Sequence, residues 1–190
     1  MKVYDINFYG KATYDLEQEV WKRIIPIEVP FNGKICQLDF YIEDARPMYT
    51  QIKYNFDDFG ITLDQIQNWQ LELYKKNETE QKELFDKYLK DPKDMMELFE
   101  QKIIKDFYEK RIDLMEDEAY CNEQFGVEVT KKIQSATNSE QILDMIHLTE
   151  LTLATNQIRI IGDCEYYEDF GMGITFDGMI DVGLEEMIYR

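Results

Sequence analysis

Apolar residues recur along this chain with two different periods. In the first sixty residues apolar and polar positions alternate, which is the pattern of half-buried β-strands. The clearest run is Lys34–Ile42. Four of its apolar residues fall on one face, which should be buried: Cys36, Leu38, Phe40 and Ile42. Further strands are expected at residues 3–9, 24–31 and 49–56.

A tight hairpin is predicted to join the expected strands at residues 24–31 and 34–42. Asn32-Gly33 separates the two runs, and both residues tolerate the positive φ that a two-residue hairpin turn requires. Pro26 and Pro30 interrupt the first run. Because proline has no backbone N–H to donate, this strand is expected at a sheet edge.

From about residue 62 the apolar period changes to that of a helix. Thr62 with Gln65 three residues later has the spacing of a capping box. Residues 77–79 are expected to break the helix, and Asp91-Pro92 is expected to start another. The apolar stripe of this later helix, Met96, Phe99, Ile103 and Phe107, is widened by Met95, Ile104, Tyr108 and Ile112. Such a stripe is typical of a face that packs against a sheet or a helix.

The last third returns to strands after a poorly patterned acidic stretch at 116–126. A short helix is expected near residues 139–145, followed by strands at 146–153, 157–163, 172–176 and 179–182. Asp177-Gly178 predicts a tight hairpin between the last two strands. The sequence therefore predicts one α+β domain, residues 1–190, with a helical middle at roughly 62–116. In it, a mainly antiparallel sheet of N- and C-terminal hairpins carries the central helices on one face.

The net charge of the chain says more about its possible partners than its overall composition does. The chain has 21 Lys and Arg against 39 Asp and Glu, a net charge of −18. Residues 112–190 hold 17 acidic and 4 basic residues, so most of the excess lies there. A field of this sign repels nucleic acid and anionic membrane and attracts basic proteins. A solvated face that only confers solubility explains the charge equally well.

Compartment and cofactor chemistry can also be argued from the sequence. The three cysteines, Cys36, Cys121 and Cys164, form no C-x-x-C pair, so free thiols in a reducing cytoplasm are expected. The N-terminus has no apolar signal region, and no segment approaches the length of a membrane span. We expect no cofactor and no resident metal ion.

Catalytic chemistry is expected to be absent. The one histidine, His147, falls in a predicted strand, and a structural role is expected for it. Gly171 and Gly173 are interpreted as a bulge or turn, because a phosphate cradle needs positive potential that this segment lacks. Carboxylates could bind Ca²⁺ or Mg²⁺ or form a hydrolytic pair, which leaves a metal-dependent hydrolase as a minor alternative.

A resemblance makes the C-terminal third more specific. The run I-R-I-I-G-D-C-E-Y-Y-E-D-F-G-M-G-I resembles a group of uncharacterised bacterial domains ending in a Cys-x-Trp-(Asp/Glu)-x-Glu-His-Gly-x-Gly strand and a hairpin. Some of these look like immunity proteins of bacterial toxin systems. Cys164, Gly171 and Gly173 match the pattern. Tyr166 replaces its tryptophan and Phe170 replaces its histidine, so any histidine-dependent chemistry of the group should be missing here.

These observations predict a non-catalytic acidic protein, of the bacterial toxin-immunity or inhibitor type, that binds a basic partner and neither nucleic acid nor membrane. Tyr166 and Tyr167 are either exposed anchors or core residues, and the pattern favours neither. A homo-oligomeric scaffold domain is the alternative function. The predicted partner-binding residues are Glu165, Tyr166, Tyr167, Glu168, Asp169, Asp177 and Asp181.

Overall fold

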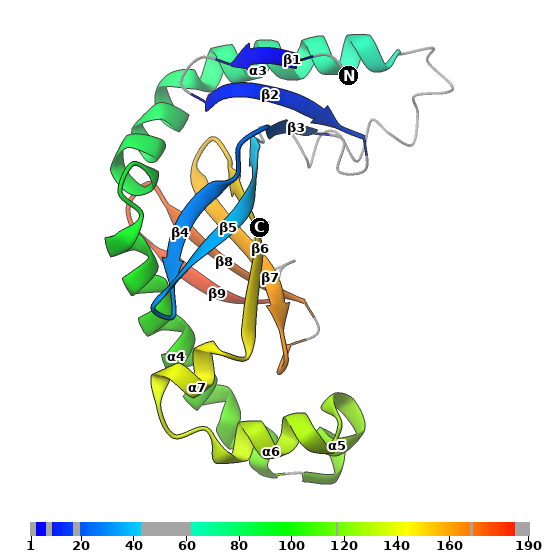
Figure 1. The fold of residues 1–190 in the computed structure, drawn as a ribbon, viewed down its shortest axis with the longest axis vertical. Coiled ribbons are helices and arrows are strands. Elements are labelled where there is room, and N and C mark those ends of the chain that lie inside the picture. Colours follow the sequence, from blue (N-terminus) through cyan, green and yellow to red (C-terminus); the bar gives the residue numbers. More distant parts are fainter. Residues whose placement is uncertain are drawn as a thin grey trace.

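A computed structural model describes residues 3–6, 9–16, 20–42, 62–116, 118–167 and 169–184. Within these ranges the chain forms six helices and one nine-stranded, mainly antiparallel sheet, with strands at both ends of the sequence and helices in the middle. Figure 1 shows the helices following one another in an arc that curves around the strands. The predicted α+β class is therefore confirmed.

Five strands come from the N-terminal part of the chain. They are β1 (Val3–Ile6), β2 (Gly10–Asp15), β3 (Val20–Arg23), β4 (Ile27–Phe31) and β5 (Lys34–Ile42). The predicted hairpin joins β4 to β5, with φ of 49° at Asn32 and 68° at Gly33. As the prolines indicated, β4 pairs with β5 alone among the described strands. The strand predicted at 49–56 lies outside the described residues.

The helical middle is longer than the sequence predicted. Its elements are α3 (Leu63–Leu84), the π-helix η2 (Phe85–Leu89), α4 (Lys93–Glu116), α5 (Glu118–Phe125), α6 (Val127–Ser135) and α7 (Ser139–Leu143). Thr62 caps α3 as expected, because its hydroxyl accepts from the Gln65 N–H while Gln65 Oε1 accepts from the Thr62 N–H.

Two helix boundaries were predicted wrongly. α3 continues through residues 77–79, and the acidic stretch after residue 116 forms α5. Asn and Thr cost only about 0.7 kcal/mol or less each in a helix interior relative to alanine. Packing of neighbouring residues such as Leu84, which is fully buried, outweighs so small a cost.

Four strands close the chain: β6 (Ile146–Leu153), β7 (Gln157–Cys164), β8 (Phe170–Thr175) and β9 (Ile180–Leu184). The order across the sheet is β1-β2-β3-β5-β6-β7-β8-β9, with β4 also on β5. Among the pairs of described strands, only β5 and β6 run parallel. A parallel pair requires a long crossover, and the helices from α3 to α7 form it.

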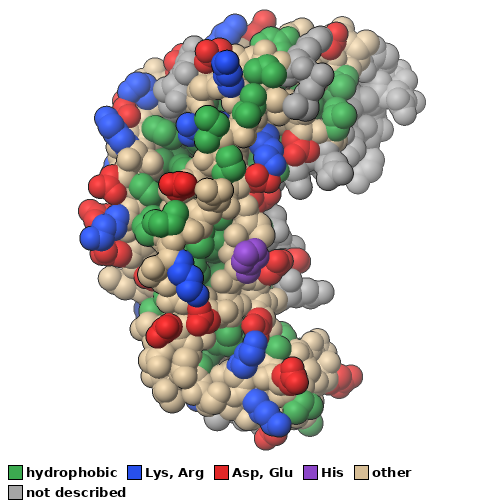
Figure 2. All heavy atoms as spheres, viewed as in Figure 1, with side chains coloured by type: hydrophobic (Ala, Val, Ile, Leu, Met, Phe, Trp, Pro, Cys, Tyr) green, Lys and Arg blue, Asp and Glu red, His purple; other side chains and the backbone are tan. Residues whose placement is uncertain are grey.

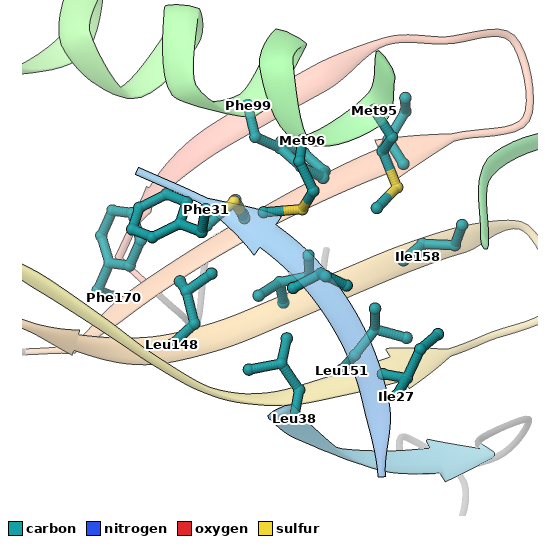
Figure 3. Close-up of a cluster of buried hydrophobic side chains, with 14 of the residues drawn as sticks. Ile27, Phe31, Leu38, Met95, Met96, Phe99, Leu148, Leu151, Ile158 and Phe170 are labelled. Atoms are coloured by element: carbon teal, nitrogen blue, oxygen red, sulfur yellow. The ribbon is translucent and has the colours of Figure 1, made fainter. Parts of the chain in front are cut away.

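α4 packs on the part of the sheet that is formed by strands β4 to β9. It contacts β4 and β9, the strands at the two ends of the series β4-β5-β6-β7-β8-β9. Met95, Met96 and Phe99 of α4 point toward the sheet, where Leu148, Ile158 and Phe170 belong to the same buried cluster (Figure 3). The predicted stripe is thus core at its first four positions, whereas Ile112 at its end is 66% exposed.

The glycines of β8 correct another prediction. Gly171 and Gly173 were interpreted as a bulge or turn, but both pair in regular register with β7 and β9. The irregularity lies instead in β6, where the register shifts between Leu148 and Glu150. The two glycines lack a side chain, but the pairing of β8 with its neighbouring strands continues without a break at both positions.

Candidate functional site

Inward and outward positions of the C-terminal sheet follow from its register. Leu148, Ile160 and Met172 point toward α4 and are buried. The alternate residues point to the other face, which we call the outer face of the sheet. On it His147 lies opposite Asp163, and Asp39 lies opposite Glu150.

The turn after β7 holds the first group of predicted site residues. The Glu165 N–H donates to the Met145 carbonyl at 3.0 Å, and the Tyr167 N–H donates to the Cys164 carbonyl at 3.2 Å. Both carboxylate oxygens of Glu165 accept from Lys132 Nζ at 2.7 Å. Glu165 therefore already has a cationic partner within the chain, on α6.

The structure places both predicted tyrosine anchors in the core. Tyr166 is 3% exposed and Tyr167 is 7% exposed. The Tyr166 ring packs edge-on against Phe107 of α4, with centroids 5.1 Å apart. The Tyr167 hydroxyl donates to Asp106 Oδ2 at 2.6 Å. Since neither ring is available to a partner, their assignment as exposed anchors is wrong, and the core alternative holds.

Burial also sets the protonation of this cluster. It raises the pKa of the Cys164 thiol to about 12, and it is the largest cause of the raised pKa values of Tyr166 and Tyr167. These groups stay protonated near neutral pH. A protonated, buried thiol is not the nucleophilic form of cysteine.

The predicted carboxylates do not form one compact face. Asp169 is exposed at the start of β8, and Asp181 is exposed on the outer face of β9. Asp177 lies in the turn after β8, at the opposite end of that strand from Asp169. A strand of this length separates them by about 20 Å. Glu168 lies outside the described residues.

Asp177 has a local structural role. Its Oδ1 accepts from the Thr175 hydroxyl at 2.5 Å and from the Met179 N–H at 3.2 Å. The hydrogen bond from Thr175 is the main reason why the pKa of Asp177 lies below its usual value. Gly178 follows with φ of 88°, which confirms the predicted hairpin.

The two sides of the molecule differ in charge. Residues 146–184 contain seven Asp and Glu and a single Lys or Arg, Arg159, which is 5% exposed. Residues 62–116 contain 14 acidic and 10 basic residues. There, lysines pair with carboxylates one turn away: Lys82–Asp86, Lys93–Glu97 and Lys105–Glu109.

Figure 2 shows this contrast. Blue and red side chains alternate over α3 and α4 along the left margin, and the single histidine lies beside acidic side chains near the hollow on the right. Asp163 of β7, Asp169 directly before β8 and Asp181 of β9 are exposed acidic residues of this C-terminal sheet. We call these three residues the acidic sheet surface. Sequence reasoning did not select Asp163, because its position opposite His147 depends on strand register.

In the described ranges, His, Cys, Asp and Glu side chains nowhere form a group of three or more that could hold a metal ion. The helices described here include none with the length and hydropathy needed to span a bilayer. The three cysteines all lie within the described residues and form no disulfide bond.

Comparison of the chain with protein-family models, with curated proteins and with solved structures gives no match.

Proposed function

We propose that this protein is a non-catalytic binding protein that holds a basic protein partner, in the manner of a bacterial toxin-immunity or inhibitor protein. The observation that carries the proposal is the charge of residues 146–184. Their exposed ionisable side chains in the described part of the sheet are carboxylates, together with His147, while their one guanidinium is buried.

The acidic sheet surface suits such a partner because its carboxylates are available. Among the described residues, no side-chain hydrogen bond or ion pair is formed by the carboxylates of Asp163, Asp169 or Asp181, whereas those of Glu165 and Asp177 are already bonded. Lys and Arg of the partner would pair with the first three. Such rim pairs accelerate encounter and contribute about 0.2–1 kcal/mol each to affinity.

A charge-reversal experiment tests the proposal. The sheet variant carries Asp163→Lys, Asp169→Lys and Asp181→Lys. The helix variant carries Glu80→Lys, Glu83→Lys and Asp94→Lys, which are exposed residues of α3 and α4, and it changes the net charge by the same amount. Tagged forms of both variants and of the parent are used to retain proteins from host extract at low and moderate salt.

The parent and the helix variant should retain one basic protein that the sheet variant loses. Calorimetry with that purified protein should then show weaker binding by the sheet variant, and inhibition of its activity by the parent would support the immunity or inhibitor role. Equal retention by all three forms would contradict the proposal. In that case light scattering over a range of concentrations would test the homo-oligomeric scaffold, since a monomer throughout is incompatible with it.

A further inference from the structure

A groove lies between β1 and α3, at the end of the sheet order opposite to β9. Figure 1 draws this strand and this helix along the same edge of the molecule. The groove encloses about 420 Å³, within the range of sites that bind small ligands or short peptide segments. Tyr4, Asp5 and Ile6 of β1 line one wall, and one face of α3 lines the other.

The groove runs along the free edge of β1. Successive side chains of a strand point to opposite faces, so three consecutive residues line one cavity only where that cavity follows the strand's edge. β1 pairs with β2 alone among the described strands. Its other edge therefore presents backbone N–H and C=O groups that no described strand pairs, which is a template for an added strand.

The opposite wall is a regular helix face. Asn68, Leu71, Glu72, Lys75 and Glu78 line the groove, and spacings of three and four residues place them on one side of α3. Tyr9 also lines the groove. Tyr9 is 1% exposed, and its hydroxyl donates to Gln81 Oε1 at 2.5 Å.

The charge of the residues that line the groove indicates which kind of segment it would bind. The lining contains three carboxylates, Asp5, Glu72 and Glu78, and one ammonium group, Lys75. A basic segment complements this excess. Pairing of β1 with the β1 of a second copy would instead bring two acidic grooves together, which like-charge repulsion opposes.

We propose that this groove binds an extended, basic peptide segment of a partner protein, which adds as a strand to β1 and lays alternate side chains against α3. The backbone of the segment pairs with the free edge, and its Lys or Arg side chains meet Glu72 and Glu78. This proposal does not rest on the acidic sheet surface, which lies on other strands.

The test uses the full chain and a fluorescein-labelled hexapeptide that alternates lysine and valine, with binding measured by fluorescence anisotropy at low salt. A glutamate–valine peptide should bind at least about tenfold more weakly. Two further lysine–valine peptides carry N-methyl groups on either their odd or their even residues. N-methylation in one of these two frames removes the donors facing β1 and should weaken binding by about tenfold.

The protein is varied in parallel. Glu72→Gln with Glu78→Gln should weaken binding of the lysine–valine peptide about three- to tenfold. Glu80→Gln with Asp94→Asn, an equal charge change on exposed positions outside the groove, should leave it unchanged. The sheet and helix variants described above should bind the peptide equally, which separates this proposal from the proposed function.

Two outcomes would overturn the proposal. If both N-methylated peptides bind as tightly as the parent peptide, the interaction is adsorption to an acidic surface without strand addition. If the peptide does not bind while sedimentation shows self-association that changes at β1 abolish, the edge pairs with a second copy. Because the N-methyl comparison leaves the protein unaltered, it holds even where a variant fails to fold.

Discussion

Gly162 of β7 lies against the register shift of β6, and replacing it by alanine tests how tightly that irregularity is packed. A Cβ built on Gly162 would lie 2.4 Å from the carbonyl oxygen of His147, and 3.0 Å from both the carbonyl carbon of His147 and Cα of Leu148. All three are backbone atoms of the paired strand. They cannot rotate away as the end of a side chain would, so the two strands must separate.

The expected cost follows from this separation. Overpacking of a closely packed site costs about 1–3 kcal/mol, and each ladder hydrogen bond weakened by the shift adds up to about 1 kcal/mol. We therefore expect Gly162→Ala to lower the free energy of unfolding by about 2–4 kcal/mol. For a chain of this length, that corresponds to a decrease in Tm of roughly 5–15 °C.

Urea denaturation followed by tryptophan fluorescence measures the loss, and Gly183→Ala is the matched control. Gly183 also lies in a strand, but its added Cβ would have no atom within 4 Å, so we expect a change within about 0.5 kcal/mol. Equal stability of Gly162→Ala and the parent protein would refute the close approach of β6 and β7. Equal losses in both variants would attribute the effect to strand glycines in general.

Three further predictions concern the ionisable groups of the fold. Tyr167→Phe should lower the free energy of unfolding by about 1–2 kcal/mol by urea denaturation, because Asp106 loses the hydroxyl that it accepts from; an unchanged midpoint would contradict this hydrogen bond. Asp177→Ala should lower Tm at neutral pH, and the difference from the parent should shrink as the pH falls below about 4. The pKa of Asp177 is lowered in the folded protein, so its ionised carboxylate stabilises the fold above that range, and this stabilisation is lost when the carboxylate is protonated. A Tm difference that does not vary with pH would contradict this. In an alkylation time course followed by mass spectrometry, the half-buried Cys36 should react before Cys164, whose pKa burial raises to about 12, and urea should remove the difference.

The parts of the fold that sequence predicted have strong local signals. The strands at 34–42 and 146–153 match β5 and β6 to the residue, and the Asn32-Gly33 turn has the positive φ values that its residues indicated. The capping box at Thr62 is likewise a local signal, and α3 begins directly after it. Alternation, turn chemistry and capping each depend on a few neighbouring residues, so a single sequence contains them in full.

The parts that were missed depend on contacts between distant segments. β2 and β3 have few apolar residues, yet Ala12 and Trp21 are fully buried. The Trp21 ring lies between those of Tyr4 and Tyr14, with centroid distances of 4.9 and 5.5 Å. These rings come from three different strands. No local pattern in β2 or β3 indicates such packing, which forms only once the strands are side by side.

The candidate site shows the same division. The sign of the charge and the segment that carries it could be predicted, because both are counts along the chain. Tyr166 and Tyr167 could not be assigned, since strict alternation would turn one ring outward. The turn after Cys164 instead directs both rings toward α4, where Asp106 and Phe107 receive them.

The difference in charge between the C-terminal sheet and the helices then has a simple origin in the helices. Lys82, Lys93 and Lys105 each pair with a carboxylate one turn further along the chain, which lies in η2 for Lys82 and in α4 for the other two. These charges of both signs therefore pair locally, whatever the tertiary fold. Asp163, Asp169 and Asp181 have no such local partner, and between residues 146 and 184 the chain offers only Arg159, which is buried. The charge of these three carboxylates is therefore left to be compensated from outside the strands. Solvent ions can do so everywhere on the surface, but only a partner with matching Lys and Arg would distinguish Asp163, Asp169 and Asp181 from an equal number of helix carboxylates.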